Sequence, residues 1–134
     1  MPPRILVIAG SDCSAGAGIQ ADLKTAFAFG VYAQTAVTAV TVQNTLGVTG
    51  VHAVPPKIVR DQIIACLTDI GADAIKTGML VSADMVAMVA RTLAAYAPQI
   101  PLVVDPVMVA KGGSRLIDEK AVATLREKLL PMAN

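Results

Sequence analysis

Four short runs of β-type residues alternate with segments of helical length, and this alternation limits the possible fold more than any other feature of the chain. The runs cover residues 5–9, 35–42, 74–77 and 102–105. The first, second and fourth are rich in Val, Ile or Leu with little polar alternation, which predicts strands buried on both faces. Strands that alternate with helices form βαβ units, so the sequence predicts an α/β fold with a mostly parallel sheet.

The segments between these runs carry helix signals. Apolar spacing over 18–29 predicts a first helix, which ends at Gly30. Ser82 is a predicted N-cap for a helix over 83–96. The other expected elements are a helix over 57–70, a helix that begins at Asp118 and ends before Pro131, and a β-rich excursion over 46–54.

The composition excludes several functional classes. Of 134 residues, 54% are hydrophobic, and the net charge is +1 with Lys and Arg scattered along the chain. Because the sequence has no basic stripe, neither nucleic acid nor an anionic membrane is expected as the main partner. Cys13 and Cys66 lie far apart without a CxxC spacing, which argues against zinc and for a reducing compartment. The apolar run at 5–9 is too short for a signal peptide or a membrane span, so we expect a cytoplasmic protein.

Ligands of an open α/β sheet bind beyond the carboxyl ends of its strands. The segments that follow the four predicted strands are therefore expected to converge on one edge of the sheet. They are the glycine-rich loop 10–18, Gln43 and Asn44, residues 77–80, and residues 105–108 followed by Lys111-Gly-Gly.

The glycine-rich loop reads GSDCSAGAGIQAD and fits a G-x-G-x-x-A spacing at Gly16, Gly18 and Ala21. An NAD site also needs an acid at the end of the second strand, and none occurs between Asp22 and Asp61. A P-loop needs Gly-Lys-Ser/Thr after the glycines, which is absent here. The alternative is structural, because glycines allow a bend and close helix packing.

Three polar side chains near the strand ends admit a functional and a structural interpretation. The Gln43 amide suits a heteroaromatic ring with mixed donors and acceptors, or it simply ends a strand. Asp22 falls in the first turn of the first helix, where the dipole favours an acid, or it accepts from a bound hydroxyl or amine. Asp105 precedes a proline and either caps a turn or holds Mg²⁺ through water near phosphates.

Other residues of the same segments complete the list of candidates. Lys111, beside two glycines, either reaches a phosphoryl oxygen as a point charge or is a solvated surface lysine. Met79 is expected to form an apolar wall. Cys13 is either a reactive thiol near a helix N-terminus or a small loop residue, and we favour the second interpretation.

Taken together, four motifs resemble the hydroxymethylpyrimidine/phosphomethylpyrimidine kinase family of thiamine biosynthesis. They are AGSDCSAGAGIQADLKT (9–25), TVQNTLGV (41–48), IKTGML (75–80) and VVDPVMVAKGG (103–113). The resemblance implies a three-layer αβα ribokinase-like fold. It also implies phosphoryl transfer from MgATP to an aminopyrimidine and then to its monophosphate, with ATP and Mg²⁺ as cofactors and a homodimer as the assembly.

The resemblance also implies roles for particular residues. Gln43 would read the edge of the pyrimidine, and Asp22 would complete the polar contacts together with the backbone of Ala17 and Gly18. The remaining roles are apolar packing on the ring by Met79 and Val107, organisation of Mg²⁺ by Asp105, and a phosphate contact by Lys111.

Two features depart from the family pattern. Ala15 stands where relatives usually have glycine, and alanine is tolerable there only if its φ is negative. Relatives are also about twice as long, so the chain is expected to be the N-terminal, pyrimidine-binding half of one kinase domain. In that case the fold is incomplete at the C-terminus, and an edge strand and apolar helix faces are exposed.

The same shortfall bears on activity. The ATP-binding segments and the activating residue would lie in the missing half, so the chain alone is expected to be inactive. The alternatives are a pyridoxal or pyridoxine kinase of the same superfamily, and a non-catalytic pyrimidine-binding module of natural length. A dinucleotide-binding oxidoreductase is a more distant alternative.

Overall fold

One mostly parallel sheet organises the chain, as the sequence predicts. The computed structural model describes residues 1–110, 112–113 and 115–134. Within these residues, five strands are ordered β3-β2-β1-β4-β5, and only β3 runs antiparallel to its neighbour. The strands are β1 (Arg4–Asp12), β2 (Tyr32–Asn44), β3 (Gly47–Ala53), β4 (Ala74–Thr77) and β5 (Leu102–Val104).

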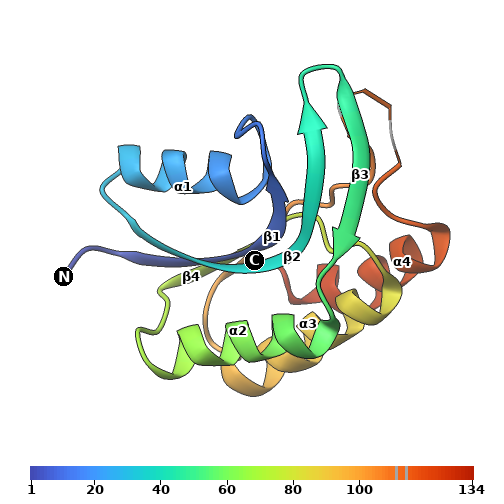
Figure 1. Ribbon diagram of the computed structural model, residues 1–134. Coiled ribbons are helices and arrows are strands. Elements are labelled where there is room, and N and C mark those ends of the chain that lie inside the picture. The colour runs from blue at the N-terminus through green and yellow to red at the C-terminus, as the bar shows by residue number, and fades with distance from the viewer. Residues whose placement is uncertain (111, 114) are drawn as a thin grey trace.

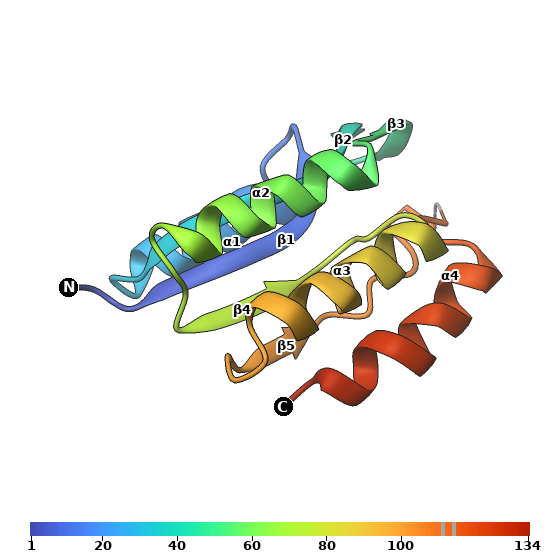
Figure 2. The same ribbon diagram turned by 90° about the horizontal axis from the view of Figure 1, so that it is seen from below.

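Helices cover both faces of this sheet. Helix α1 (Gly18–Ala28) lies against β1 and β2 on one face, whereas the other helices pack side by side on the opposite face (Figures 1 and 2). Those helices are α2 (Pro56–Thr68), α3 (Ala83–Tyr96) and α4 (Glu119–Thr124). None of the helices in the described ranges is both long enough and apolar enough to cross a membrane.

The core lies mainly between the sheet and the layer of α2 and α3. Leu6 and Ile8 of β1 point into this layer and contact a cluster that includes Ile63 and Val89. The alternate residues of β1, such as Val7, pack beneath α1 in a smaller cluster. Strand β1 is therefore buried on both faces, as its unbroken apolar run predicts.

The same prediction is wrong for β2 and β5. In β2, Val40 is 51% exposed and Val42 is 61% exposed, and both residues lie in the part of the strand that forms a hairpin with β3 (Figure 1). In β5, Val103 is 57% exposed. An apolar run shows that a strand can be buried, but the covering helix on each face decides whether it is.

The first three helices lie within two residues of their predicted bounds, whereas β1 and β2 extend beyond the predicted strands, to Asp12 and to Asn44. Helix α3 begins and ends at the expected residues, and the Ser82 side chain accepts a hydrogen bond from the Met85 amide. The excursion expected over 46–54 is β3. Asp118 caps α4, but the expected single helix continues as a π-helical turn (Leu125–Leu129) and then as a 3₁₀ turn (Leu130–Met132). Proline has no amide to donate to an α-helical ladder, so Pro131 lies in the 3₁₀ turn.

A surface ion pair joins β1 to the segment before β4 and makes stability depend on pH. Arg4 Nη2 lies 2.8 Å from Asp73 Oδ1, and the Arg4 amide donates to Asp73 Oδ2 at 2.8 Å. These hydrogen bonds from Arg4 lower the pKa of Asp73 from 3.8 to about 2. A carboxylate with a lowered pKa stabilises the fold above its ordinary pKa, and this contribution is lost as the pH falls toward about 2.

We therefore expect Asp73→Asn to flatten the acid limb of the stability profile. The unaltered chain should lose free energy of unfolding as the pH falls from the ordinary carboxyl range toward about 2, and the variant should lose less over that interval. Urea denaturation at a series of pH values measures the free energy of unfolding of both proteins. Equal losses in the two proteins would show that the pair does not contribute.

Candidate functional site

A cavity of about 330 Å³ opens at the carboxyl ends of β1, β2, β4 and β5. The segments that follow these strands in the sequence converge there, as expected for an open α/β sheet. All of the predicted site residues that the structure describes line this one cavity, namely Ala17, Gly18, Asp22, Gln43, Met79, Asp105 and Val107. Lys111, the predicted phosphate contact, lies outside the described residues.

The glycine-rich loop is folded around the carboxylate of Asp12, the last residue of β1. Asp12 is 3% exposed, and its Oδ1 accepts from the amide and the hydroxyl of Ser14 at 2.9 and 2.7 Å. Its Oδ2 accepts from the amides of Gly16 and Ala17 at 3.1 and 2.8 Å. Burial raises the pKa of Asp12, but these hydrogen bonds outweigh burial and hold its pKa below 3.8. A charged acceptor at the strand end thus fixes the path of the loop into α1.

The same loop is joined to the end of β2. The thiol of Cys13 donates to the backbone carbonyl of Gln43 at 3.1 Å and accepts from the backbone amide of Gln43 at 3.3 Å. The register of β2 against β3 shifts between Val42 and Gln43. The Gln43 side chain accepts from the Thr41 hydroxyl at 3.2 Å and lines the cavity. Cys13 therefore has a structural role that its sequence position did not indicate.

Ala15 does not meet the condition that the sequence set for it. Its φ is +67°, in the left-handed region that favours glycine, and its amide donates to the Asp12 carbonyl at 2.9 Å in a tight turn. A side chain in this region costs energy because the Cβ atom crowds the backbone. The condition of a negative φ is therefore not met, and the turn around Asp12 holds alanine in an unfavourable conformation.

Ala15→Gly is therefore expected to raise the free energy of unfolding by about 1 kcal/mol, since relief of the backbone conformation exceeds the greater entropy of glycine in the unfolded chain. Ala17→Gly is a matched control, because Ala17 has a φ of −143° that any residue adopts. The control should be neutral or slightly destabilised. Urea titrations of both variants measure the difference, and a loss of stability in Ala15→Gly would contradict the expectation.

Three charged side chains from three elements meet at one wall of the cavity. Lys76 of β4 donates to Oδ1 and Oδ2 of Asp22 in α1 at 3.0 and 2.8 Å. The same ammonium lies 3.9 Å from Oδ2 of Asp105, which follows β5. Asp22 was predicted in the first turn of α1, but that turn contains no acid, and Asp22 lies in the next turn. An ion pair, rather than the helix dipole, is therefore its structural partner.

The apolar wall of the cavity comes from Met79 and Val107. Met79 is 8% exposed, and its carbonyl accepts from the Thr38 hydroxyl at 2.6 Å. Gly10 leaves room for the Met79 side chain, because a Cβ at Gly10 would lie 2.5 Å from Met79 Cε. A flat apolar ring fits against such a wall, with the polar groups of Asp22 and Gln43 at its edge.

The carboxylate of Asp105 has the chemistry of a ligand for a hard divalent cation. Its side chain is 54% exposed at the carboxyl end of the sheet, and its backbone amide donates to the Thr77 carbonyl at 2.9 Å. Among the described residues, no three His, Cys, Asp or Glu side chains form a group that could enclose a metal. Mg²⁺ commonly uses one or two carboxylates, with water and phosphate as its other ligands, so a single carboxylate fits this ion.

Two functional residues were missed at the level of the sequence. In the sequence, Asp12 looks like an ordinary residue at the end of a strand. The one signal of its role is the Asp-x-Ser pattern, which is typical of an Asx turn. Lys76 lies inside the motif IKTGML, where one lysine in a buried strand was itself a signal. A lysine in such a strand needs a carboxylate partner, but its identity depends on which elements the fold places beside β4.

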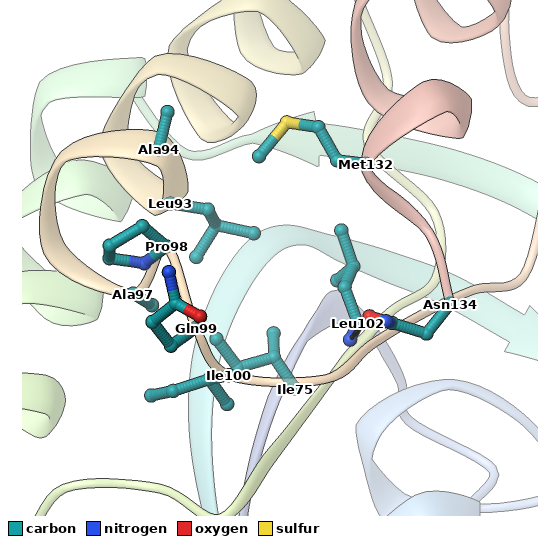
Figure 3. A pocket seen from close by; sticks show the side chains of 10 residues that line it. All are labelled: Ile75, Leu93, Ala94, Ala97, Pro98, Gln99, Ile100, Leu102, Met132 and Asn134. Atoms are coloured by element: carbon teal, nitrogen blue, oxygen red, sulfur yellow. Dashed lines mark hydrogen bonds between the residues drawn. The ribbon is translucent and has the colours of Figure 1, made fainter.

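A second cavity, of about 370 Å³, lies at the opposite edge of the sheet, between α3, β5 and the last residues (Figure 3). It is lined mostly by apolar side chains, including Leu93 and Met132, and no lining residue is charged. Asn134 accepts from the Leu102 amide at 2.9 Å. Because ligands of α/β sheets bind beyond the carboxyl ends of the strands, the first cavity is the candidate site.

Known proteins resemble this chain over almost its whole length. The sequence model of the family described as phosphomethylpyrimidine kinase matches residues 12–134. A hydroxymethylpyrimidine/phosphomethylpyrimidine kinase of Mycobacterium tuberculosis is 54% identical over 132 residues, which are 98% of this chain and 48% of that protein. The chain thus spans about half the length of the curated kinases of this kind that it matches.

Solved structures of two kinases superpose on almost the whole chain. The crystal structure of phosphomethylpyrimidine kinase from Clostridium difficile 630 superposes with a TM-score of 0.90 at 45% identity, covering 98% of this chain and 56% of that one. Pyridoxal kinase from Staphylococcus aureus, in complex with pyridoxal, gives a TM-score of 0.86 at 37% identity, covering 99% of this chain and 48% of that one. The predicted ribokinase-like αβα fold is confirmed.

Proposed function

Since the chain belongs to the phosphomethylpyrimidine kinase family, we propose that it forms the pyrimidine-binding side of an ATP-dependent kinase. The proposed reaction phosphorylates 4-amino-5-hydroxymethyl-2-methylpyrimidine and then its monophosphate, in thiamine biosynthesis. One observation carries the proposal: residues from four separate motifs line a single cavity at the carboxyl edge of the sheet. A parallel sheet brings its strand ends to one edge in any case, but here the motifs also place an apolar wall and polar side chains around the same cavity, as a small heteroaromatic ligand requires.

The cavity offers a pyrimidine both an apolar face and polar edges. In the proposed complex, the ring packs on Met79 and Val107, and the Gln43 amide reads a ring nitrogen together with the exocyclic amine. Asp22 accepts from an amine or a hydroxyl of the same ligand. The Ala17 amide is already bonded to Asp12, so the contribution of this residue and Gly18 would be close backbone packing rather than a new donor.

The proposed chemistry needs little covalent participation by the protein. Phosphoryl transfer depends on holding the hydroxyl in line with the phosphate and on stabilising the charge that is spread over the phosphoryl oxygens. Asp105 would hold Mg²⁺ together with water, and this ion would neutralise phosphate charge when bound. Lys111 follows Asp105 closely in the sequence and would supply a further positive charge. The group that activates the hydroxyl is not assigned to any residue of this chain.

Two measurements test the proposal. Isothermal titration of the 134-residue chain should show binding of the aminopyrimidine alcohol, without turnover when MgATP is added. The protein as its own organism produces it should convert the same alcohol with MgATP to the monophosphate and then to the diphosphate. Absence of binding in the first experiment would contradict the proposed site, and absence of turnover in the second would contradict the proposed reaction.

A pyridoxal kinase is the second candidate, because the chain superposes closely on a pyridoxal kinase with bound pyridoxal. Turnover of pyridoxal without turnover of the aminopyrimidine would favour this reaction. A non-catalytic pyrimidine-binding module is the third. It requires a native intact mass near 13.8 kDa, which mass spectrometry of the native protein measures directly.

The proposal includes a cytoplasmic homodimer. Cys13 and Cys66 are both free thiols, which fits a reducing compartment. The hairpin of β2 and β3 exposes Val40, Val42 and Leu46, the last at 88%, and such an apolar surface suits contact with a second copy. Sedimentation equilibrium of the native protein measures the assembly.

A further inference from the structure

Lys76 lies between the two carboxylates to which the proposed function gives separate tasks. It comes from β4, whereas Asp22 comes from α1 and Asp105 follows β5. Its ammonium donates to both oxygens of Asp22 and lies 3.9 Å from Asp105 Oδ2. The Lys76 and Asp22 side chains are only 20% and 24% exposed, so water screens this pair less than a surface pair.

Asp22 can accept further hydrogen bonds only from the side that faces the 330 Å³ cavity. Lys76 and Asp22 also form one side of a hollow of about 280 Å³ under α1, whose other lining is mostly apolar and includes Val7, Ala26 and Phe29. An ionised carboxylate has about four acceptor positions, and the ammonium occupies two of them. A ligand in the 330 Å³ cavity is placed to use the others.

We propose that Lys76 is a positioning residue, which holds Asp22 as an oriented, charged acceptor for a donor group of the pyrimidine and prevents repulsion between Asp22 and Asp105. This inference rests on the proposed function, because the ligand is the aminopyrimidine. Without the ammonium, two carboxylates would face one cavity with no cation between them, and the side chain of Asp22 would lose the contacts that fix its rotamer.

Binding of the aminopyrimidine alcohol to the 134-residue chain, measured by isothermal titration, tests the proposal. Lys76→Met keeps the length of the side chain and removes its charge, and we expect the dissociation constant to rise by about tenfold or more. Lys24→Met is the matched control, since Lys24 is exposed on the same helix as Asp22. The control should bind like the unaltered chain. Thermal unfolding shows whether Lys76→Met is folded.

A double-mutant cycle separates positioning from a general effect on the fold. If Lys76 acts through Asp22, then Lys76→Met should weaken binding much less in an Asp22→Asn background than in the unaltered chain. The same comparison is made with two analogues, one without the amine and one without the hydroxyl. Lys76→Met should weaken the binding of one of them less than it weakens the binding of the alcohol, because one of these two groups is the donor to Asp22.

The outcomes distinguish this inference from the function on which it rests. Additive effects of the two substitutions, or an equal penalty for the alcohol and both analogues, would overturn the positioning role while the proposed binding function stands. Tight binding by the unaltered chain with unchanged binding by Lys76→Met would do the same. If the unaltered chain binds no aminopyrimidine, the proposed function fails and the role of Lys76 fails with it.

Discussion

Gly18→Ala is expected to lower the free energy of unfolding by about 3 kcal/mol and to abolish binding in the candidate site. Gly18 is the first residue of α1 and has a φ of +60°, where a side chain is unfavourable. A Cβ atom there would overlap the Gly10 carbonyl oxygen and would lie 3.1 Å from the Asp12 amide nitrogen. These are backbone atoms of β1, so a change of rotamer cannot relieve the overlap, and the start of α1 must move away from β1.

Gly16→Ala is the matched control in the same loop. The nearest atom to a Cβ at Gly16 is Oδ2 of Asp12 at 3.7 Å, an ordinary contact, and the φ of Gly16 lies outside the left-handed region. We expect a loss of less than about 1 kcal/mol for this variant. Urea denaturation and isothermal titration measure both variants side by side. Similar stability of Gly18→Ala and Gly16→Ala would contradict the close approach of α1 to β1.

Asp12→Ala is expected to destabilise the protein by a similar amount, about 3 kcal/mol. The substitution removes the acceptor of four hydrogen bonds, which come from Ser14, Gly16 and Ala17. Water can reach part of the exposed loop and replace some of these hydrogen bonds. The expected loss of stability is therefore less than the sum for four hydrogen bonds that are fully buried. The loop would no longer be held in one conformation, and aminopyrimidine binding should weaken by at least tenfold, or about 1.4 kcal/mol.

Asp69→Ala is the control for the loss of a carboxylate, because Asp69 is exposed at the end of α2, away from the cavity. Its stability and binding should match those of the unaltered chain. Chemical denaturation, together with titration of the aminopyrimidine, measures the pair. Retention of full affinity in a folded Asp12→Ala variant would show that the loop does not need its buried carboxylate.

The strand-end rule predicted most of the site from the sequence. Gln43 lies at the end of β2, whereas Met79 follows β4 and Asp105 and Val107 follow β5, and parallel strands bring their carboxyl ends to one edge whatever the details of packing. Asp22 was predicted as a ligand contact, but its structural partner was not. The helix dipole was the expected partner, whereas the fold supplies Lys76 from a strand that lies 54 residues further along the chain.

The conformation of the glycine loop was predictable only in part. The sequence indicated a bend with close packing at Gly18, and the structure confirms this role. For Ala15 the sequence supplied a condition on φ, and the structure shows that the condition is not met. The reason is Asp12, whose four accepted hydrogen bonds fix the turn strongly enough to hold alanine in the left-handed region.

The sequence alone determined the order and type of the elements, because hydrophobic periodicity, helix caps and turn residues act over a few neighbouring positions. It also determined which segments reach the ligand edge, because the direction of parallel strands follows from the βαβ connections. Only the tertiary structure decided which side chains meet there. The partners of Asp12, Asp22 and Cys13, and the exposure of Val103, depend on strand register and on which helix covers which face. These are long-range contacts, and local patterns in the sequence do not specify them.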